Sequence, residues 1–509
     1  MNSALQIMGY GAWNGGTLTD NSMYENKGMF FKNDIPVTHE TILERIGIRT
    51  RMVAPEDVRI GTIALEDLMK SNDFDPARVK IIIGATNVGD DKFDPGPLIR
   101  YPFDIVKDKC QSATAFDLYA GCPGYNVSVE LLLMLSLTGY LKQGDISIVV
   151  GAENIHRCKA FKPKNTSNII FGDDSIATAL ETMCSVDMPE NSIETRTFQG
   201  SLKPDFTEQL SQLAEIICDL NGTDKIDGIL MDNKLGILPQ RVPATASRLQ
   251  HSLMLRMHPE KADLATGFKD LLALYDDHVD SFAFDINSLN DDPDLVKTFA
   301  QAYIRAGKQR NMVSVYLRQD YSVEVTVHKG DSFVFTRPDK GIVDARTRTH
   351  GCFASYIQAV SRDGELFGEM NGKGVFLYAT RGARNHIEAL LGDNNLSMKK
   401  LDLLIEHQAN FAMLPLTLGQ VLANGQPDLK KDVMDYLANK MITNIQERGN
   451  CSVVCMQRLP YDLAKGSLKP DTINDFPINR NLEALQSAKI ILNDSVGAGM
   501  TRSSFIQRL

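Results

Sequence analysis

Apolar, strand-like runs alternate with a helical run in the first third of the chain. "VKIIIGAT" (Val79–Thr86) and "ISIVVGAE" (Ile146–Glu153) are continuous apolar runs, and "VSVELLLMLSLTGYL" (Val127–Leu141) has the length of a largely buried helix. Strands that are apolar on both sides are typical of sheets with helices on both faces. The pattern predicts an α/β fold, and "NIIFGDDSIATALE" (Asn168–Glu181) adds a strand, a Gly-Asp turn and a further strand that close a first unit near residue 190.

The same succession of patterns recurs faintly when residues from about 205 to 340 are laid over those from about 60 to 185. The matching segments of the later part are Asp224–Asp232, Ser281–Asp292, Ala300–Asp320 and His328–Phe335. In this overlay Asn290 takes the place of Cys122. We therefore expect an inserted α/β unit that is a degenerate and catalytically silent copy of the first. The alternative is that unrelated α/β units share patterns at this level.

Three domains are expected, over residues 1–190, 191–340 and 341–509. A chain of 509 residues is long enough for two to four domain-sized units. The third domain has a helical pattern over Gly374–Gly392 and a strand pattern from Leu401 that turns polar at its end. Its last strand pattern begins at Lys489 and finishes in a turn of small residues.

The net charge argues against one class of partner. The chain has 64 acidic and 54 basic residues and a formal net charge of -10, whereas nucleic-acid binding needs a concentrated positive surface. An anionic ligand must therefore be met locally, and "HRCKAFKPKN" (His156–Asn165) gathers Lys159, Lys162 and Lys164 after a predicted strand. The alternative interpretation of this segment is a solvated loop, because runs of charge commonly face water.

The cysteines and the apolar runs indicate a cellular compartment. The eight cysteines are scattered and include no CxxC pair with the spacing of a metal site, so we expect reduced thiols and no metal. The first residues, "MNSALQIMGYGAW", lack the basic and apolar segments of a cleavable signal. Because no run approaches the roughly 20 apolar residues of a membrane span, we predict a cytoplasmic protein.

A cysteine between glycines follows one of the predicted strands. In "FDLYAGCPGYNVS" (Phe116–Ser128), Cys122 lies at a strand-to-helix turn, where unpaired N–H groups and the positive end of the helix dipole favour a thiolate. Gly121 and Gly124 give the turn backbone freedom and leave space for a carbonyl carbon, and Pro123 suits the first helical position. The alternative is an inert core thiol, since free cysteines are most often small buried hydrophobic groups.

Polar side chains also end the strand pattern of the third domain. In "LDLLIEHQAN", His407 and Asn410 follow an apolar strand, and strand ends are where sheets present catalytic groups. "GNCS" supplies Asn450 after a glycine, which by itself indicates a turn. A lone histidine more often has a structural role. Together, however, a thiol, an imidazole and a carboxamide can perform acyl transfer from a thioester and stabilise a developing enolate.

Seven colinear segments resemble the ketoacyl-acyl-carrier-protein synthase III family of condensing enzymes. The segments are "TILERIGIRTRMVAPED", "AFDLYAGCPGYNVSVELL", "IFGDDSIATALE", "GELFGEMNGKGVFLYA", "LLIEHQAN", "ERGNCSV" and "SVGAGMTRSSF". They cover about residues 1 to 185 and 341 to 509, and a minimal member of the family has no counterpart of the part between them. The resemblance implies a thiolase-like fold: two mixed-sheet α/β halves in a layered αβαβα core, here with an inserted α/β unit.

The resemblance also implies roles for individual residues. Cys122 accepts the acyl group, His407 and Asn450 bind the thioester carbonyl of malonyl while carbon dioxide leaves, and the backbone N–H groups of Cys122 and Ala498 form an oxyanion hole. The residues that it assigns to coenzyme A or pantetheine are Arg45, Lys162, Lys164 and Asn410. It implies no cofactor other than the acyl-coenzyme A or acyl-carrier-protein thioesters that serve as substrates.

The predicted function is an acyltransferase of fatty acid or polyketide biosynthesis that condenses a Cys122-bound acyl group with a malonyl-type thioester by a decarboxylative Claisen reaction. Alternatives are a head-to-head condensation of two acyl thioesters, acyl transfer to an oxygen or nitrogen nucleophile, and a non-catalytic partner subunit that binds acyl thioesters. Phe411 stands where the family usually has a basic residue, which weakens the case for docking an acidic carrier protein.

The resemblance further implies a homodimer, because a thiolase-type subunit pairs through its cysteine-bearing half. The inserted unit could cover that dimer surface, reshape the acyl tunnel or dock a carrier protein.

Overall fold

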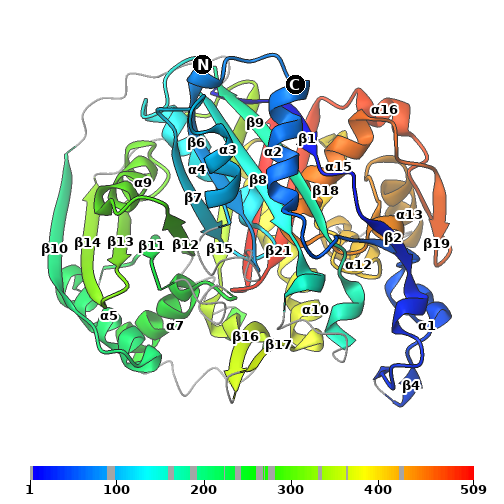
Figure 1. The fold of residues 1–509 in the computed structure, drawn as a ribbon, viewed down its shortest axis with the longest axis horizontal. Helices are drawn as coiled ribbons and strands as arrows, with labels where there is room; N and C mark the ends of the chain where they lie inside the picture. The colour runs from blue at the N-terminus through cyan, green and yellow to red at the C-terminus, as the bar shows by residue number, and fades with distance from the viewer. Residues whose placement is uncertain are drawn as a thin grey trace.

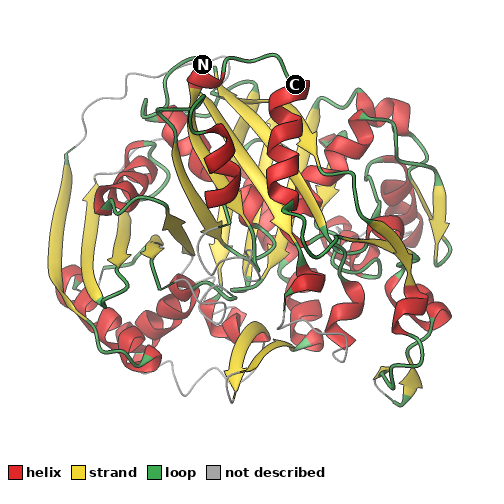
Figure 2. Cartoon of the chain, viewed as in Figure 1, coloured by secondary structure: helices red, strands yellow, loops and turns green. Residues whose placement is uncertain are grey.

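The computed structural model describes residues 4–31, 33–88, 98–158, 166–183, 192–222, 224–235, 242–259, 268, 270–272, 281–330, 335–362, 365–423 and 429–509. Within these residues a large and a smaller sheet, each with helices packed against it, form the body of the protein (Figure 2). No helix of this described part is long and apolar enough to cross a membrane.

Ten strands form one continuous sheet, in the order β1-β9-β8-β6-β7-β12-β11-β13-β14-β10 (Figure 1). Five come from the first predicted domain: β1 (Leu5–Ala12), β6 (Val79–Ala85), β7 (Thr114–Tyr119), β8 (Ile146–Glu153) and β9 (Asp174–Thr182). Five come from the predicted insertion: β10 (Ile193–Ser201), β11 (Gly228–Asn233), β12 (Phe282–Ser288), β13 (Asn311–Leu317) and β14 (Ser322–Gly330). The inserted segment therefore extends the sheet of the first domain, and the two join where β7 pairs with β12.

Helices cover the large sheet on both faces, which explains the continuous apolar runs of its inner strands. All eight residues of β8 are buried. In the first domain, α2 (Ile60–Ser71) and α3 (Arg100–Val106) pack on one face and α4 (Gly124–Leu137) on the other. In the inserted part, α5 (Phe206–Asn221) and α7 (Thr245–Met257) share one core, and α9 (Pro293–Arg305) packs beside α4 in another.

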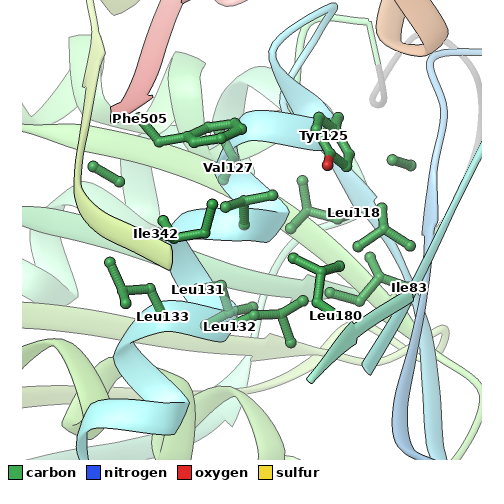
Figure 3. Packing of buried hydrophobic residues seen from close by; sticks show 14 of the residues in the cluster. Ile83, Leu118, Tyr125, Val127, Leu131, Leu132, Leu133, Leu180, Ile342 and Phe505 are labelled. Carbon is green, nitrogen blue, oxygen red and sulfur yellow. The ribbon is translucent and has the colours of Figure 1, made fainter. Parts of the chain in front are cut away.

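The helix α4 lies at the centre of the molecule, and all of its residues are buried. It contacts the large sheet on one side and the small sheet on the other. Figure 3 shows its leucines in one apolar cluster with Leu118 of β7 and with Ile342 and Phe505 of the small sheet. Burial of one Leu or Val side chain contributes about 1.5–3 kcal/mol, so α4 is a principal source of the stability that holds the two sheets together.

The third predicted domain forms a four-stranded sheet. Its strands, in spatial order, are β15 (Gly341–Thr349), β22 (Thr501–Arg508), β21 (Ile490–Gly497) and β18 (Leu403–Glu406). The helices on its outer side are α10 (Gly372–Arg381), α11 (Ala383–Asp393) and α12 (Met413–Leu422), while α15 (Cys455–Ala464) joins α4 between the sheets. The layers alternate helix, sheet, helix, sheet and helix, which confirms the predicted αβαβα core.

Shorter elements lie around these layers. The small two-stranded sheets are β2 (Thr17–Asp20) with β5 (Thr50–Val53), β3 (Phe30–Phe31) with β4 (Ile35–Pro36), β16 (Ile357–Arg362) with β17 (Glu365–Met370), and β19 (Asp471–Ile473) with β20 (Phe476–Ile478). The outer helices are α1 (His39–Ile46), α13 (Leu429–Asn439), α14 (Ile445–Arg448) and α16 (Leu482–Gln486).

One strand prediction in the α/β units was wrong, and another falls partly outside the described residues. The segment from Asn168 does not begin as a strand, because residues Thr166–Ile170 form a 3-10 turn. The guanidinium of Arg51, fully buried, binds the carbonyls of Ile169 and Phe171, which leaves these groups unavailable to a neighbouring strand. The last segment of the repeat, His328–Phe335, begins in β14, which spans Ser322–Gly330, and residues 331–334 of the segment lie outside the described residues. The sequence overlay matched the Gly-Asp pair of this segment to the earlier Gly-Asp pair and made no use of the alternating buried valines of β14.

Two predictions in the third domain need smaller corrections. The expected helix over Gly374–Gly392 is two helices, α10 and α11, which meet at Gly382. The final strand pattern is a hairpin of β21 and β22, so the small-residue turn around Ala498 lies between two strands and not at the end of one. This hairpin carries the turn back toward Cys122.

Candidate active site

Cys122 lies in the short loop between β7 and α4. Gly121 has φ of 71°, which disfavours any residue with a side chain, and a Cβ there would stand 2.5 Å from the backbone nitrogen of Ala498. A Cβ at Gly497 would likewise stand 2.4 Å from the nitrogen of Cys122. The glycines therefore let two backbone segments from distant parts of the sequence, Gly121–Cys122 and Gly497–Ala498, come into close contact.

A chain of hydrogen bonds ends on the sulfur of Cys122. Ser452 Oγ donates to Cys122 Sγ over 3.4 Å, and Asn87 Nδ2 donates to Ser452 Oγ over 2.8 Å. The same Nδ2 donates to Glu153 Oε1 over 2.6 Å, and the backbone N–H of Asn87 donates to that oxygen over 3.0 Å. Because Asn87 occupies a lone pair of the Ser452 oxygen, the hydroxyl hydrogen is left to point at the sulfur.

Burial is the main influence on the ionisation of the Cys122 thiol and the Glu153 carboxyl. Burial raises the pKa of the Cys122 thiol to about 12, while the hydrogen bond from Ser452 lowers it and the charge of Glu153 raises it further. Burial also raises the pKa of Glu153 to about 7, although the hydrogen bonds from Asn87 lower it. The sequence suggests a thiol activated by the end of a helix, whereas in the structure burial is the largest influence on the pKa of Cys122 and favours the protonated thiol before a substrate binds.

His407 follows β18, and its backbone N–H donates to the carbonyl of Asp494 over 2.8 Å. Neither ring nitrogen has a hydrogen-bond partner among the described residues, although the side chain is buried. Burial lowers the pKa of His407 to about 4, and the nearby Asp494 opposes this only in part. The imidazole is therefore neutral near pH 7, with one N–H that can donate to a ligand.

Asn450 lies in a turn that is fixed by its own backbone. Its N–H donates to the carbonyl of Ile170 over 2.7 Å, and its carbonyl accepts from Gly172 over 3.1 Å. Its Oδ1 accepts from the backbone N–H of Ser452 over 2.8 Å, so the Nδ2 end of the amide is the end that can donate to a ligand. Ser452 itself has φ of 50°, an uncommon conformation outside glycine that often marks functional sites.

One cavity of about 670 Å³, part of it open to solvent, brings the three predicted residues together. Cys122, His407 and Asn450 all line it, as do Asn87, Ser452 and the turn at Gly497 and Ala498. The rest of its wall is mainly apolar and comprises Val88, Ile155, Ile170, Phe171, Val242, Ile357, Met370, Val375, Ala409, Met413, Val496 and Met500. Such a wall suits the hydrocarbon part of an acyl group, with the polar groups gathered at one place.

Of the four residues expected to hold coenzyme A or pantetheine, the two that the structure describes do not line this cavity. Arg45 is on α1 and exposed, with its guanidinium 5.5 Å from the centre of the Phe31 ring. Asn410 does not line the cavity, and its Oδ1 accepts from the backbone N–H of Ala412 over 2.9 Å. Lys162 and Lys164 lie outside the described residues. The roles of all four stay predictions.

Sequence reasoning missed several residues of the site. Asn87 and Glu153 each lie at or just after the end of a predicted strand, the position that drew attention to His407. Ser452 lies inside the quoted "ERGNCSV" segment. Val242, from the inserted segment, has no local signal that could have indicated its place, because only the pairing of β7 with β12 brings that segment to the cavity.

No protein-family model matches the chain. Among curated proteins named beta-ketoacyl-[acyl-carrier-protein] synthase III, that of Prochlorococcus marinus is 29% identical over 161 residues and that of Thermosynechococcus vestitus is 31% identical over 152 residues. These matches take in 30% and 29% of this chain and 44% and 43% of the relatives. The chain thus spans less than half the length of the curated relatives it matches.

Solved structures match over nearly the whole fold. The 3-oxoacyl-[acyl-carrier-protein] synthase III of Aquifex aeolicus has a TM-score of 0.51 at 15% identity, over 99% of this chain and 100% of that one. The corresponding Pseudomonas aeruginosa structure has a TM-score of 0.51 at 14% identity, over 99% and 98% of the two chains. The protein therefore has the thiolase-like fold of these structures, and part of its sequence resembles beta-ketoacyl-[acyl-carrier-protein] synthase III proteins.

Proposed function

We propose that this protein is a condensing acyltransferase that uses Cys122 as its nucleophile. The observation that carries the proposal is that Cys122, His407 and Asn450 line one cavity whose wall is otherwise mainly apolar. They come from β7–α4, the end of β18 and the turn before α15, and a structural role for all three would not require that they share one space. The similarity to beta-ketoacyl synthase III proteins agrees with this assignment.

In the first step, the sulfur of Cys122 attacks the carbonyl carbon of an acyl thioester. A carbon–sulfur bond to Cys122 forms, the bond to the departing thiol breaks, and the thiol proton of Cys122 ends on the departing sulfur. The donor is coenzyme A or an acyl carrier protein, and no separate cofactor takes part. The backbone N–H groups of Cys122 and Ala498, which the close contact of their turns brings together, bind the carbonyl oxygen as it becomes negative.

In the second step, a malonyl-type thioester loses carbon dioxide, and the electron pair of the broken bond forms an enolate. The neutral imidazole of His407 and the Nδ2 amide of Asn450 donate to the enolate oxygen. The enolate carbon then attacks the acyl carbon on Cys122, which forms the new carbon–carbon bond and releases the sulfur. Ser452 Oγ donates to that sulfur and stabilises the thiolate as it leaves, and a proton from solvent then restores the thiol.

The make-up of the cavity favours the decarboxylative reaction over a head-to-head condensation. A head-to-head reaction needs a base that removes an α-proton from the second acyl group. Of the described residues that line the cavity, only Cys122 and His407 titrate, and the imidazole has a pKa of about 4. A weak base of this kind is poorly matched to an α-proton, whereas decarboxylation needs only donors to the enolate oxygen.

Mass spectrometry of the intact protein tests the first step. The protein is incubated with a panel of acyl-coenzyme A thioesters, and we expect one acyl group per chain, which is absent from the Cys122→Ala variant. Products are then analysed after addition of malonyl-coenzyme A or malonyl-carrier protein, where a β-ketoacyl thioester and carbon dioxide are expected. Absence of any adduct with every chain length would favour a non-catalytic binding protein.

A further inference from the structure

The inserted segment and the first domain are related by an approximate two-fold axis. The strand order β1-β9-β8-β6-β7 of the first domain is repeated in reverse as β12-β11-β13-β14-β10. At the junction, β7 and β12 are antiparallel, and both contain the triplet Ala-Phe-Asp, which ends at Asp117 and Asp285. Leu118 pairs with Ile286, the next residue after the same triplet, so equivalent residues of the two copies lie opposite each other.

Buried contacts follow the same symmetry. The carboxylate of Asp117 accepts from the backbone N–H groups of Leu98 and Ile99, at the start of α3, over 2.6 and 2.9 Å. The carboxylate of Asp285 accepts from those of Thr245 and Ala246, at the start of α7, over 2.7 and 2.8 Å. One aspartate in each copy thus fixes a helix to the sheet in the same way, which unrelated α/β units would not be expected to share.

Without the inserted segment, β7 would be an edge strand with unpaired backbone groups. Such an edge is open to pairing with another chain, and a two-fold related copy of β7 is the kind of strand that fits it. Here β12 occupies that position. The sheet instead ends at β10, a strand with mostly exposed residues that include Glu194 and Arg196, and charged residues of this kind discourage further pairing.

The inserted segment also reaches the candidate active site. Val242, just before α7, is buried and lines the cavity that holds Cys122. It packs in one apolar cluster with Val88, Ile155 and Ala498, and its carbonyl accepts from the backbone N–H of Ala359 over 2.8 Å. The wall of the cavity is therefore built from three parts of the chain, and one of them is the inserted part.

Different groups occupy the place that matches Cys122 in the inserted copy. Asn290 stands there, and the ammonium of Lys234 contacts its carbonyl oxygen at 3.1 Å and the carboxylate of Asp232 at 3.4 Å. These contacts fill the ends of β11 and β12 with an ion pair. The two copies therefore share one scaffold. Of the two matched positions, only residue 122 carries a nucleophilic side chain.

We propose that the inserted segment, residues 191–340, acts as an internal partner subunit: it covers β7 within the same chain and supplies Val242 to the wall of the acyl pocket. A second chain is then not needed to complete the site. In this arrangement the size of residue 242 limits the length of the acyl group that Cys122 can accept. The part that concerns the acyl group rests on the function proposed above, whereas the part that concerns β7 does not.

Acyl-chain profiles test the contribution of Val242. Adduct formation on Cys122 is measured with acyl-coenzyme A thioesters of increasing length, for the wild type, Val242→Phe and Val242→Ala. We expect Val242→Phe to move the preference to shorter chains and Val242→Ala to longer ones, each by about tenfold or more in the ratio of rates. Val327→Ala is the matched control, because Val327 is a buried valine of the inserted core that does not line the cavity. Unchanged profiles in folded Val242 variants would overturn the role of this residue.

A mixing experiment tests whether the partner is internal. Chains with Cys122→Ala are coexpressed with chains that carry Val242→Phe and an intact Cys122, under different tags. If the inserted segment acts within its own chain, the altered profile of Val242→Phe persists, and light scattering gives a particle of 56.4 kDa. A wild-type profile restored in the mixed particle would show that Val242 acts on a second chain and would overturn the proposal.

The two proposals can fail separately. No adduct with any thioester would contradict the acyltransferase assignment, and the mass of the particle would still report on the covering of β7. Adducts that form normally but do not respond to residue 242 would contradict only the internal-partner role at the pocket.

Discussion

The cysteine-bearing domain and the inserted segment follow the same path through one sheet, but of the two only the cysteine-bearing domain carries polar groups that line the candidate site, among them Cys122 and Asn87. Both keep the buried aspartate that fixes a helix to the sheet, Asp117 in one and Asp285 in the other. They differ where the strands end. Cys122 is matched by Asn290, five residues after the aspartate in each copy. Asn87 and Lys234 also match, because each lies three residues after the strand residue that pairs with the aspartate.

This difference distinguishes residues that stabilise the fold from residues that take part in the proposed reaction. A buried carboxylate that accepts two backbone N–H groups is costly to lose wherever it occurs, because its donors would be left without partners. A thiol and an amide at a strand end contribute little to packing. A copy that only has to pair with β7 and cover it can therefore lose them, and in the inserted segment a lysine–aspartate pair lies at the matching strand end.

The matched residues Cys122 and Asn290 give the strongest test of the difference between the two copies. Cys122→Ala should remove the acyl adduct completely, because the sulfur is the atom that forms the bond. Asn290→Ala should leave the adduct and its rate unchanged, since the side chain stands in the copy without a nucleophile. Intact-mass spectrometry of both variants with the same thioester checks this. A fall in acylation for Asn290→Ala comparable to that for Cys122→Ala would mean that the copy is not silent.

The second test separates the two half-reactions. His407→Ala should lower the rate of condensation by about 10²–10³-fold, the usual cost of one donor to a developing oxyanion, with acylation of Cys122 retained. Because the pKa of His407 is about 4, the condensation rate should show no inflection from this residue between pH 6 and 8. Product analysis and adduct mass are measured on the same samples.

The control for this variant is His251→Ala, on α7 of the inserted segment and outside the cavity. It should leave both half-reactions unchanged. Loss of acylation together with condensation in His407→Ala would indicate instead that the imidazole activates the thiol.

The sequence was informative where polar residues interrupt an apolar pattern. Cys122 and His407 each follow a buried strand, and that contrast is visible without a structure. The layered α/β fold was also predictable, because continuous apolar strands require helices on both sides. The position of Asn450 in the cavity rested on the family resemblance, since a residue in a turn after glycine has no pattern of its own.

Other features depend on pairing between distant segments. The sequence overlay indicated a second copy, but it could not show that β12 joins β7, because strand pairing leaves no mark in either strand alone. Val242 is a single valine in a connecting segment, and its contact with the cavity follows only from that pairing. The overlay likewise followed a Gly-Asp match at the end of β14 and made no use of the alternating valines within that strand.

The third test concerns the shared aspartates. Asp117→Ala and Asp285→Ala should each lower the free energy of unfolding by roughly 2–4 kcal/mol, because each leaves two buried N–H groups without an acceptor. Chemical denaturation followed by circular dichroism measures both. A matched control is Asp320→Ala, an exposed aspartate of the inserted segment, which should change the free energy of unfolding far less. If only one of the two buried aspartates matters, the structural likeness of the copies is weaker than proposed.

The free energy of unfolding measured over a range of pH gives a further test of the aspartate in the inserted copy. Burial raises the pKa of Asp285 from 3.8 to about 7, so the folded state holds a proton that the unfolded state releases between these values. The contribution of this group to stability is therefore greatest below about pH 4 and falls as the pH rises toward 7. In Asp285→Asn that part of the slope should disappear. An identical pH dependence in wild type and variant would contradict the assignment of the slope to this residue.

The smallest expected effect lies in the hydrogen bonds around the sulfur. Ser452→Ala removes the donor to Cys122 Sγ, so the pKa of the thiol should rise further above its usual range. Since only the thiolate reacts, alkylation by iodoacetamide at pH 8 should slow by about tenfold, which corresponds to about 1.4 kcal/mol for one hydrogen bond to a charged group.

The control for this variant is Ser128→Ala on α4, whose hydroxyl donates to the carbonyl of Gly124 and not to the sulfur. A pH profile that shifts upward only in Ser452→Ala separates the loss of a donor from a general loosening of the site, which would change the rate without moving the midpoint. In the inserted copy, the hydroxyl of Ser288 donates to Asp232, so a serine near a strand end is not in itself a sign of an active thiol. What matters is the acceptor that the hydroxyl faces, and of these two serines only Ser452 faces a sulfur.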